Sequence, residues 1–263
     1  MTDELGTAGI YIYCIIDADT ARNFDCTGIG GNGDEVYTLC HEGIAAVVSR
    51  SRIMKYPITR RHTIAHQKVL EEAMKTNAVL PVRFSTIAEG KDGLSAEEKI
   101  KEKVLEERRR EFHELFLKMK DKAELGIKAL WRDMNAVFRQ IVSENSQIGR
   151  LRDKINSKSP GVTQSDRVRL GEMVKKALDA KRANLAGQIV GLLRSCSVDV
   201  RTNKIFGDRM IVNSAFLVEK NRIAEFDARV NALSERLGEG ITFKYVGPVP
   251  PCNFVDIVIR WES

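Results

Sequence analysis

The sequence lacks a long apolar run. None of its 263 residues lies in an uninterrupted apolar stretch of roughly 18 residues, the length that suggests a transmembrane helix. The N-terminus, MTDELGTAG, is acidic and has no apolar region of the kind that a secretion signal needs. We therefore expect a cytoplasmic protein that makes no use of a membrane.

Cysteine motifs are missing too. The five cysteines are an odd number and include no Cys-x-x-Cys pair, so neither a disulfide framework nor a zinc site is predicted. Cys14 and Cys196 lie in or beside apolar runs, where a thiol packs as a small apolar side chain. We expect both to be buried.

A strong excess of one charge is absent. The chain has 42 Lys and Arg against 36 Asp and Glu, a net charge of +6. This modest excess permits an acidic or nucleic-acid partner without favouring one. With 43% hydrophobic and 30% charged residues, the chain is typical of a globular protein with a substantial core. Its length suits one large domain or two ordinary ones.

The first third predicts a small α+β domain, residues 1–90. Its polar, glycine-rich stretch 19–34 is expected to be a loop. Pro81 lacks an N–H donor, so the strand around it should lie at a sheet edge or bulge. The predicted elements are a strand at 10–16, a hairpin of strands 35–40 and 44–48, a helix at 59–75 and an edge strand at 79–84.

Residues 91–120 predict a charged connecting helix. Ser95 and Glu98 have the spacing of a capping box, in which each side chain bonds the other residue's backbone N–H. The helix is expected to run to about Lys118.

Residues 121–263 predict a second domain. The expected order is strand, two helices, strand, strand, helix, strand, which is a modified ferredoxin-like βαββαβ fold with an inserted long helical hairpin at 131–195. Asn221 is the expected N-cap of the last helix, and Gly238 and Gly240 suit its C-terminus. Asn145, Arg152 and Arg182 interrupt the apolar seam of the hairpin. The tail 247–263 is rich in proline.

Several motifs could carry chemistry, but each has a simpler interpretation. Gly28–Gly31 follows no strong strand, opens no helix and lacks the Lys-Ser/Thr of a phosphate loop, which favours a turn. His62 and His66 share a helix face, so an enzyme with a metal at these residues is one alternative, although no third ligand is evident. No residue has a recognisable catalytic setting. We expect no enzyme activity, cofactor or metal.

A basic cluster at 50–61 offers another alternative. It contains Tyr56 and five cations: Arg50, Arg52, Lys55, Arg60 and Arg61. Such a cluster can bind phosphate groups, and a ferredoxin-like sheet can bind RNA. The modest net charge makes nucleic acid the weaker choice of partner.

Three segments together resemble the GvpF/GvpL family of gas vesicle accessory proteins. The first is IYIYCII with the later GIGG and GIAAVVS. The second, HQKVLEEAMKTNAVLPVRFST, is similar to the family's central signature, but Ser85 stands where the family usually has glycine. The third is GPVPPCNF, in which Val249 and Cys252 replace two aromatic residues of the usual tail.

This resemblance implies a fold and a role. The family is described as two-domain, with a modified ferredoxin-like C-terminal part and no catalytic residues. Its members are minor components of gas vesicles that are thought to bind the hydrophobic major shell protein and to assist assembly with other accessory proteins. We expect the edge strand 79–84 or the tail to contact the shell protein. The predicted partner-binding residues are Leu80, Val82, Arg83, Phe84, Tyr245, Pro250, Pro251 and Phe254.

Overall fold

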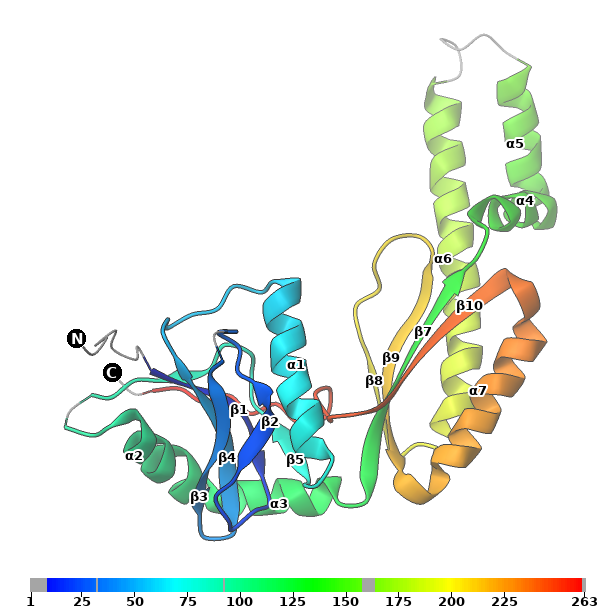
Figure 1. The fold of residues 1–263 in the computed structure, drawn as a ribbon. Helices are drawn as coiled ribbons and strands as arrows, with labels where there is room; N and C mark the ends of the chain where they lie inside the picture. Colours follow the sequence, from blue (N-terminus) through cyan, green and yellow to red (C-terminus); the bar gives the residue numbers. More distant parts are fainter. Residues whose placement is uncertain (1–8, 32, 92, 158–163, 262–263) are drawn as a thin grey trace. The chain divides into compact units, whose positions relative to one another are not determined.

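The computed structural model describes residues 9–31, 33–91, 93–157 and 164–261. The chain is a mixed α+β protein with two sheets (Figure 1). It divides into two units, each described by itself: unit 1 is Met1–Glu124 with Pro248–Ser263, and unit 2 is Leu125–Gly247. The helices at 91–120 and the tail therefore group with the N-terminal part, whereas the sequence suggested a separate connector and a tail attached to the C-terminal domain.

The sheet of unit 1 is built around a fully buried strand, β1 (Gly9–Ile16). The strand order is β2-β3-β4-β1-β5, and β6 (Ile87–Ala88) also pairs with β1. Strands β3 (Glu35–His41) and β4 (Ile44–Ser51) form the predicted antiparallel hairpin. Positive φ angles at Glu42 and Gly43 fit the tight turn between them.

The glycine-rich stretch contains a strand that the sequence did not predict. Strand β2 (Asn23–Thr27) pairs antiparallel with β3, with Phe24 opposite Val36. It is the outer strand of the sheet, and its residues alternate between exposed and half-buried. The expectation of a loop was wrong because an outer strand needs little apolar side chain, so its pattern is weak.

The opposite edge is shorter than predicted and is covered by the tail. Strand β5 (Val79–Pro81) ends at the proline. Beyond it, Val82 N donates to Tyr13 O of β1, and Arg83 N donates to Ile257 O. Val82 and Ile257 form a parallel bridge. The backbone that would otherwise form an open edge is thus partly paired within the chain.

The helices of unit 1 begin where the sequence predicted. Thr59 caps α1 (Arg60–Met74), and Ser95 and Glu98 form the capping box of α2 (Ala96–Ile100). The expected single helix to Lys118 is wrong, since a π-helical segment at 101–106 separates α2 from α3 (Arg109–Met119). The wider π-helical turn lets the adjacent Val104 and Leu105 both be buried.

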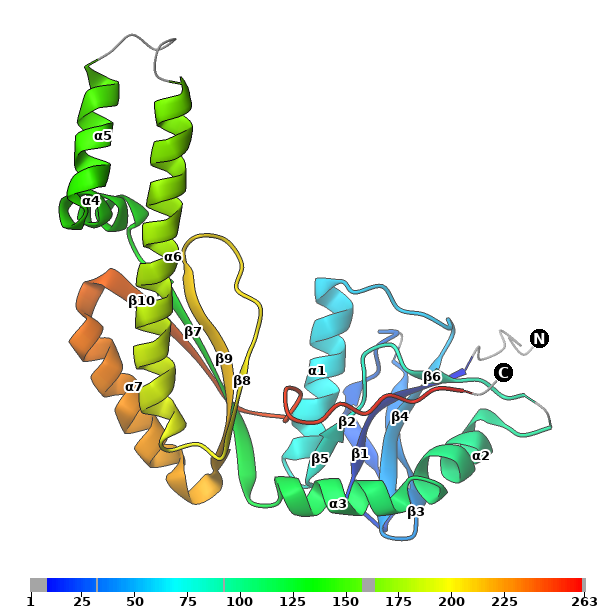
Figure 2. The ribbon, with the colours of Figure 1, turned by 180° about the vertical axis from the view of Figure 1, so that it is seen from behind.

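The sheet of unit 2 has the order β10-β7-β9-β8. Its strands are β7 (Lys122–Trp131), β8 (Asp199–Thr202), β9 (Met210–Glu219) and β10 (Ile241–Val249). Trp131 N donates to Arg209 O and Arg132 N donates to Gly240 O, so the end of β7 meets the starts of both neighbours, as in antiparallel pairs. Helices α6 (Gln164–Arg194) and α7 (Ile223–Leu237) lie on the same face of the sheet (Figures 1 and 2).

The helical insertion has three helices where two were expected. They are α4 (Met134–Glu144), α5 (Ser146–Asn156) and α6 (Gln164–Arg194). The break falls at Asn145, whose backbone is extended and whose Nδ2 donates to Ile141 O at 2.9 Å. The backbone N–H of Asn145 donates to the same carbonyl at 3.1 Å, so both groups bond the last turn of α4 while the extended backbone ends the helix. Helix α5 then runs beside α6, whereas α4 runs across it (Figure 1).

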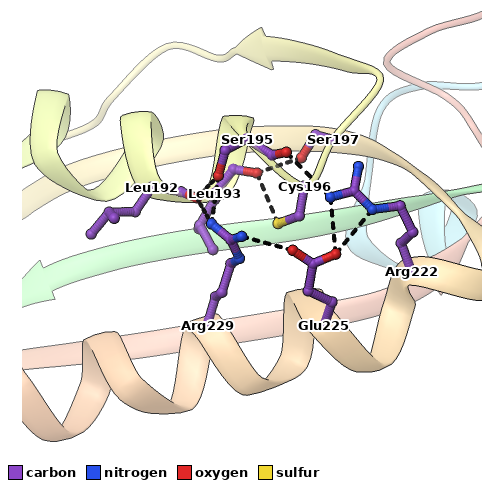
Figure 3. Close-up of polar contacts among 8 residues, drawn as sticks. All are labelled: Leu192, Leu193, Ser195, Cys196, Ser197, Arg222, Glu225 and Arg229. Atoms are coloured by element: carbon purple, nitrogen blue, oxygen red, sulfur yellow. Dashed lines mark hydrogen bonds and ion pairs between the residues drawn. The ribbon is translucent and has the colours of Figure 1, made fainter.

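The C-terminus of α6 is held by two arginines (Figure 3). Arg229 donates to Leu192 O at 3.1 Å and to Ser195 Oγ at 2.5 Å, and Arg222 donates to Ser195 O at 3.3 Å. Glu225 accepts from both arginines. Cations at a helix C-terminus satisfy its free carbonyls and oppose its dipole. These contacts hold the C-terminal end of α6 on α7 (Ile223–Leu237).

Asn221 does not cap α7 as predicted. It lies in a short 3-10 turn at 220–222, and the helix starts at Ile223 without a side-chain cap. Arg222 takes the N-cap position because its side chain is engaged with Glu225 and the end of α6. The C-terminus follows the prediction, since Gly238 has a φ of 58°.

Candidate partner-binding site

A groove of about 350 Å³ lies in unit 1. One side is formed by Ile58, which precedes α1, and by Thr63, His66 and Gln67 of that helix, and the tail forms the other side. Its lining is completed by Pro81, Val82, Arg83, Phe84, Cys252, Val255, Asp256 and Ile257. The groove thus joins the end of β5 to the segment that covers this edge.

A hydrogen-bonded network of buried side chains supports the groove from beneath. Tyr11 Oη lies 3.0 Å from His66 Nδ1 and accepts from Ser85 N at 2.8 Å. Ser85 Oγ in turn accepts from Tyr56 N at 2.8 Å. The rings of Tyr11, His66 and Phe84 pack edge to face. These contacts fix the segment 83–86 against β1 and α1.

Burial sets the charge states in this network. Desolvation raises the pKa of Tyr11 above the usual range of a phenol. The same effect lowers the pKa of His66 to about 4, so this imidazole is neutral at pH 7. The histidine in the groove lining is therefore uncharged, and the two charged lining residues, Arg83 and Asp256, form an ion pair with each other.

The tail is held at three points. Arg83 donates to both carboxylate oxygens of Asp256, at 2.7 and 2.8 Å. Glu124 accepts from Asn253 N at 2.8 Å and from its Nδ2 at 2.5 Å. Arg108 donates to Val258 O at 3.0 Å. The carboxyl of Glu124 is buried, and desolvation raises its pKa despite the bonds from Asn253.

The predicted partner-binding residues lie in four different settings. Arg83 and Phe84 line the groove, and Pro251 and Phe254 of the tail are half-buried. The side chains of three others are buried within unit 1: Leu80, Val82 and Pro250. Tyr245 lies in unit 2, where its ring is near Phe226 and its hydroxyl donates to Asp227. The structure therefore brings most of the set together and separates Tyr245 from it.

Sequence reasoning missed an apolar segment beside the groove, residues 53–64. Ile58 is 85% exposed and lines the groove, while Ile53, Met54 and Ile64 are 42–45% exposed. Arg52, Lys55, Arg60 and Arg61 of the basic cluster are interspersed among them and exposed. The signal that could have revealed the segment is the occurrence of large apolar residues where a solvated loop should be polar.

The buried state of Tyr56 argues against the basic cluster as an RNA site. Its ring is 5% exposed and its hydroxyl lies 3.1 Å from Ser51 Oγ, so it cannot stack on a base. The cluster also belongs to unit 1, whereas the proposed RNA-binding sheet is in unit 2.

On its two central strands, the face of the unit 2 sheet that points away from the helices carries no aromatic side chain among the described residues. Ile127 and Phe216 of the central strands belong to the core beneath the helices. Alternate positions on the same strands carry Gly126, Lys128 and Ala215. None of these is aromatic, whereas sheets of this kind that bind RNA stack bases on aromatic side chains.

The two histidines do not share a site. His66 Nδ1 bonds Tyr11, and His62 Nδ1 lies 3.0 Å from Pro57 O. Among the residues that the structure describes, no three His, Cys, Asp or Glu side chains are grouped as metal ligands.

The glycine-rich turn packs on the sheet, since Ile29 N donates to Tyr13 Oη at 2.7 Å and a Cβ at Gly28 would lie 2.7 Å from Ser49 Oγ. None of the described helices is long and apolar enough to cross a bilayer.

Comparison with known proteins identifies the family. A family model described as gas vesicle synthesis protein GvpL/GvpF matches residues 9–256. Gas vesicle protein F of Streptomyces sp. (strain CB03234) is 32% identical over 87% of this chain and 91% of its own. Gas vesicle protein F1 of Halobacterium salinarum is 25% identical over 98% of this chain and 97% of its own.

Solved structures show the same fold. The crystal structure of GvpF from Anabaena sp. PCC7120 has a TM-score of 0.78 at 22% identity and covers 96% of this chain and 100% of its own. That of GvpF from Microcystis aeruginosa has a TM-score of 0.73, covering 94% and 99%. The chain belongs to the GvpL/GvpF family of gas vesicle proteins.

Proposed function

We propose that this protein is a non-enzymatic accessory protein that binds the hydrophobic gas vesicle shell protein and assists gas vesicle assembly. The observation that carries the proposal is the set of exposed apolar side chains in residues 53–64, one of which, Ile58, lines the groove, in a chain whose family is described by gas vesicle synthesis. The protein then acts in the cell interior, together with other gas vesicle proteins.

The segment has the composition that such a task needs. A shell subunit with a strongly apolar side aggregates before it is incorporated, because exposed apolar patches associate. Ile53, Met54, Ile58 and Ile64 offer such a side a matching surface. The interspersed cations keep the same surface soluble when no partner is bound. Transient coverage by this surface would lower the concentration of free, aggregation-prone subunits.

The contact residues follow from the groove. Ile58, Arg83 and Phe84 line it, and the half-buried Pro251 and Phe254 of the tail lie outside that lining. Leu80 and Pro250 act from beneath by holding the edge and the tail in place, whereas the buried Val82 is also part of the groove lining. Tyr245, in unit 2, would serve a separate contact.

We also propose a ferredoxin-like classification for unit 2, with two structural domains in the chain. The order of its elements and the strand order β10-β7-β9-β8 support the first proposal. The two compact groups of contacts support the second.

A pull-down with purified shell protein tests the function. The variant Ile58→Asp with Ile64→Asp places two charges in the apolar segment and should weaken binding about tenfold or more, since burying an unpaired charge is costly. Phe206→Asp in unit 2 is the matched control, because Phe206 is also exposed, at 65%. Unchanged binding by the double variant would refute the proposed surface.

A further inference from the structure

The charges of this chain are segregated along the sequence. Residues 146–182, the outer part of the helical insertion, have ten Lys and Arg against four Asp and Glu. Their net charge of +6 equals that of the entire chain. We call this segment the basic hairpin. The first 49 residues have eight Asp and Glu against one Arg. Charge asymmetry of this size within one chain indicates electrostatic surfaces for partners.

Part of the positive charge of the hairpin is exposed and uncompensated. Arg150 of α5 and Arg169 and Lys176 of α6 are exposed, and no ion pair joins them to a carboxylate within the described residues. Arg169 and Lys176 are seven residues apart on one helix and therefore share a face. Arg150 lies six residues before the end of α5 and Arg169 five residues after the start of α6, so both helices contribute exposed cations toward the ends that follow each other in the chain.

Two of the carboxylates in the N-terminal part of the chain are exposed on the outer strands of the unit 1 sheet. Asp25 lies on the outer strand β2, and Glu35 of β3 is opposite Thr27 in the register of the two strands. Both carboxylates are exposed, and neither forms an ion pair with any described residue. Arg22, the single cation of residues 1–49, lies over the Phe24 ring and donates to Asn77. Two further cations lie nearby: Arg50 lines a pocket together with the carboxylates of Asp34, Glu35 and Glu97, and Lys75 lies within electrostatic reach of Asp25. We call this surface the acidic edge.

We propose that the basic hairpin of one copy docks on the acidic edge of a second copy of this chain. Each surface repels its own kind and attracts the other, so the contact is head-to-tail rather than two-fold symmetric. A head-to-tail contact leaves one free hairpin and one free acidic edge in every dimer, and association can continue. This inference goes beyond the proposed function and does not depend on it.

The composition of the hairpin favours a protein partner over a nucleic acid. Residues 146–182 contain no Phe, Tyr or Trp, whereas surfaces for single-stranded nucleic acids stack bases on aromatic side chains. Exposed Val168, at 55%, adds an apolar contact near the cations. Exposed cations beside an apolar side chain suit a polar strand edge with carboxylates.

Sedimentation velocity of the full chain tests the proposal. At about 50 mM NaCl, where charges are weakly screened, the mean mass should rise with protein concentration to the dimer and beyond, and at about 500 mM NaCl it should return to that of a monomer. A wild-type protein that stays monomeric at low salt and about 100 µM, a concentration at which contacts of micromolar Kd are formed, overturns the proposal.

Charge reversal identifies the two surfaces. Arg150→Glu, Arg169→Glu and Lys176→Glu together should abolish self-association, and so should Asp25→Lys with Glu35→Lys. A mixture of the two variants should associate again, because each then offers what the other lacks. The matched control is Lys68→Glu, Arg236→Glu and Lys244→Glu, which changes the net charge equally at exposed positions outside both surfaces.

Three results would contradict the docking. The control could lose association as fully as the hairpin variant, which would indicate an effect of net charge alone. The mixture could fail to associate although both variants keep the melting temperature of the wild type. The wild type could stay monomeric and instead bind a single-stranded RNA probe through the hairpin, which would assign the surface to nucleic acid.

Discussion

The cores of the two units are built in different ways. That of unit 1 contains Tyr11, Tyr13 and Tyr56, and the hydroxyl of each has a partner, such as Ser49 for Tyr13 at 2.8 Å. The core of unit 2 is apolar, with Phe216 and Phe226 in edge-to-face contact at its centre. Unit 1 thus combines burial with directional bonds, whereas unit 2 depends on close packing.

This difference fits the tasks that we assign to the units. Buried hydrogen-bond networks are costly unless every group is satisfied, so they restrict the chain to one arrangement. In unit 1 that arrangement fixes the groove and the segment 83–86. In unit 2 close packing is enough to anchor α6, whose outer part carries the basic hairpin. The following predictions compare the two cores, from the largest expected effect to the smallest.

Removal of a central ring should damage unit 2 most. Phe226→Ala empties a fully buried position and should reduce the free energy of unfolding by about 3–5 kcal/mol. Urea denaturation followed by circular dichroism measures the loss. A change below about 1 kcal/mol, the range of well-tolerated core substitutions, would show that the core of unit 2 is not packed as described.

Acid should destabilise unit 1 through His66. Its pKa is 6.5 in the unfolded chain and about 4 in the fold, so the unfolded state binds the proton more readily between these values. Stability is therefore full above pH 6.5 and declines as the pH falls toward 4, by on the order of 3 kcal/mol.

The contribution of His66 is the difference between wild type and His66→Gln. The variant has no imidazole to protonate, so its stability should decline less between pH 7 and 4. Equal slopes for the two proteins in denaturant titrations over this range would contradict a buried, neutral His66.

Loss of one hydroxyl should also affect unit 1. Tyr11→Phe keeps the ring but leaves Ser85 N and His66 Nδ1 without their partner. Buried polar groups without partners cost about 1–3 kcal/mol. Faster amide exchange at Ser85 should accompany this loss, and unaltered exchange and stability would show that the network is dispensable.

Substitution of Ser85 should change the stability least, and the order of two variants tests the backbone strain at this position. Its φ of 65° is left-handed, which explains why glycine suits this position. Ser85→Gly relieves the strain but loses the acceptor for Tyr56 N, and both terms are about 1 kcal/mol, so they should nearly cancel. Ser85→Ala loses the bond and keeps the strain, and it should be less stable than Ser85→Gly in thermal melts. The opposite order would contradict the strain at this position.

The sequence predicted those elements whose signals are local. The closely spaced strands 35–40 and 44–48, the capping box of Ser95 and Glu98 and the C-terminal glycine at Gly238 each involve neighbours along the chain, and the structure contains all three. Cys14 and Cys196 are buried free thiols, as their apolar surroundings predicted.

The missed features depend on contacts between distant residues. Strand β2 is defined by pairing with β3, and the tail by bonds to Arg83, Arg108 and Glu124. The break at Asn145 is an exception, because it occurs within a local stretch whose apolar seam continues across it. In the candidate site, the residues of 80–84 were found by resemblance, but the role of Ile58 required its measured exposure.

Flotation of cells tests the central claim most directly. In a gas-vesicle-forming cell that depends on this protein, the gene would be replaced by the Ile58→Asp, Ile64→Asp allele or by the Phe206→Asp control at equal protein level. The account predicts that the control cells float and that the double-variant cells sink, with shell protein in the insoluble fraction. Normal flotation and normal vesicles in the double variant would contradict the binding of shell protein by the segment 53–64.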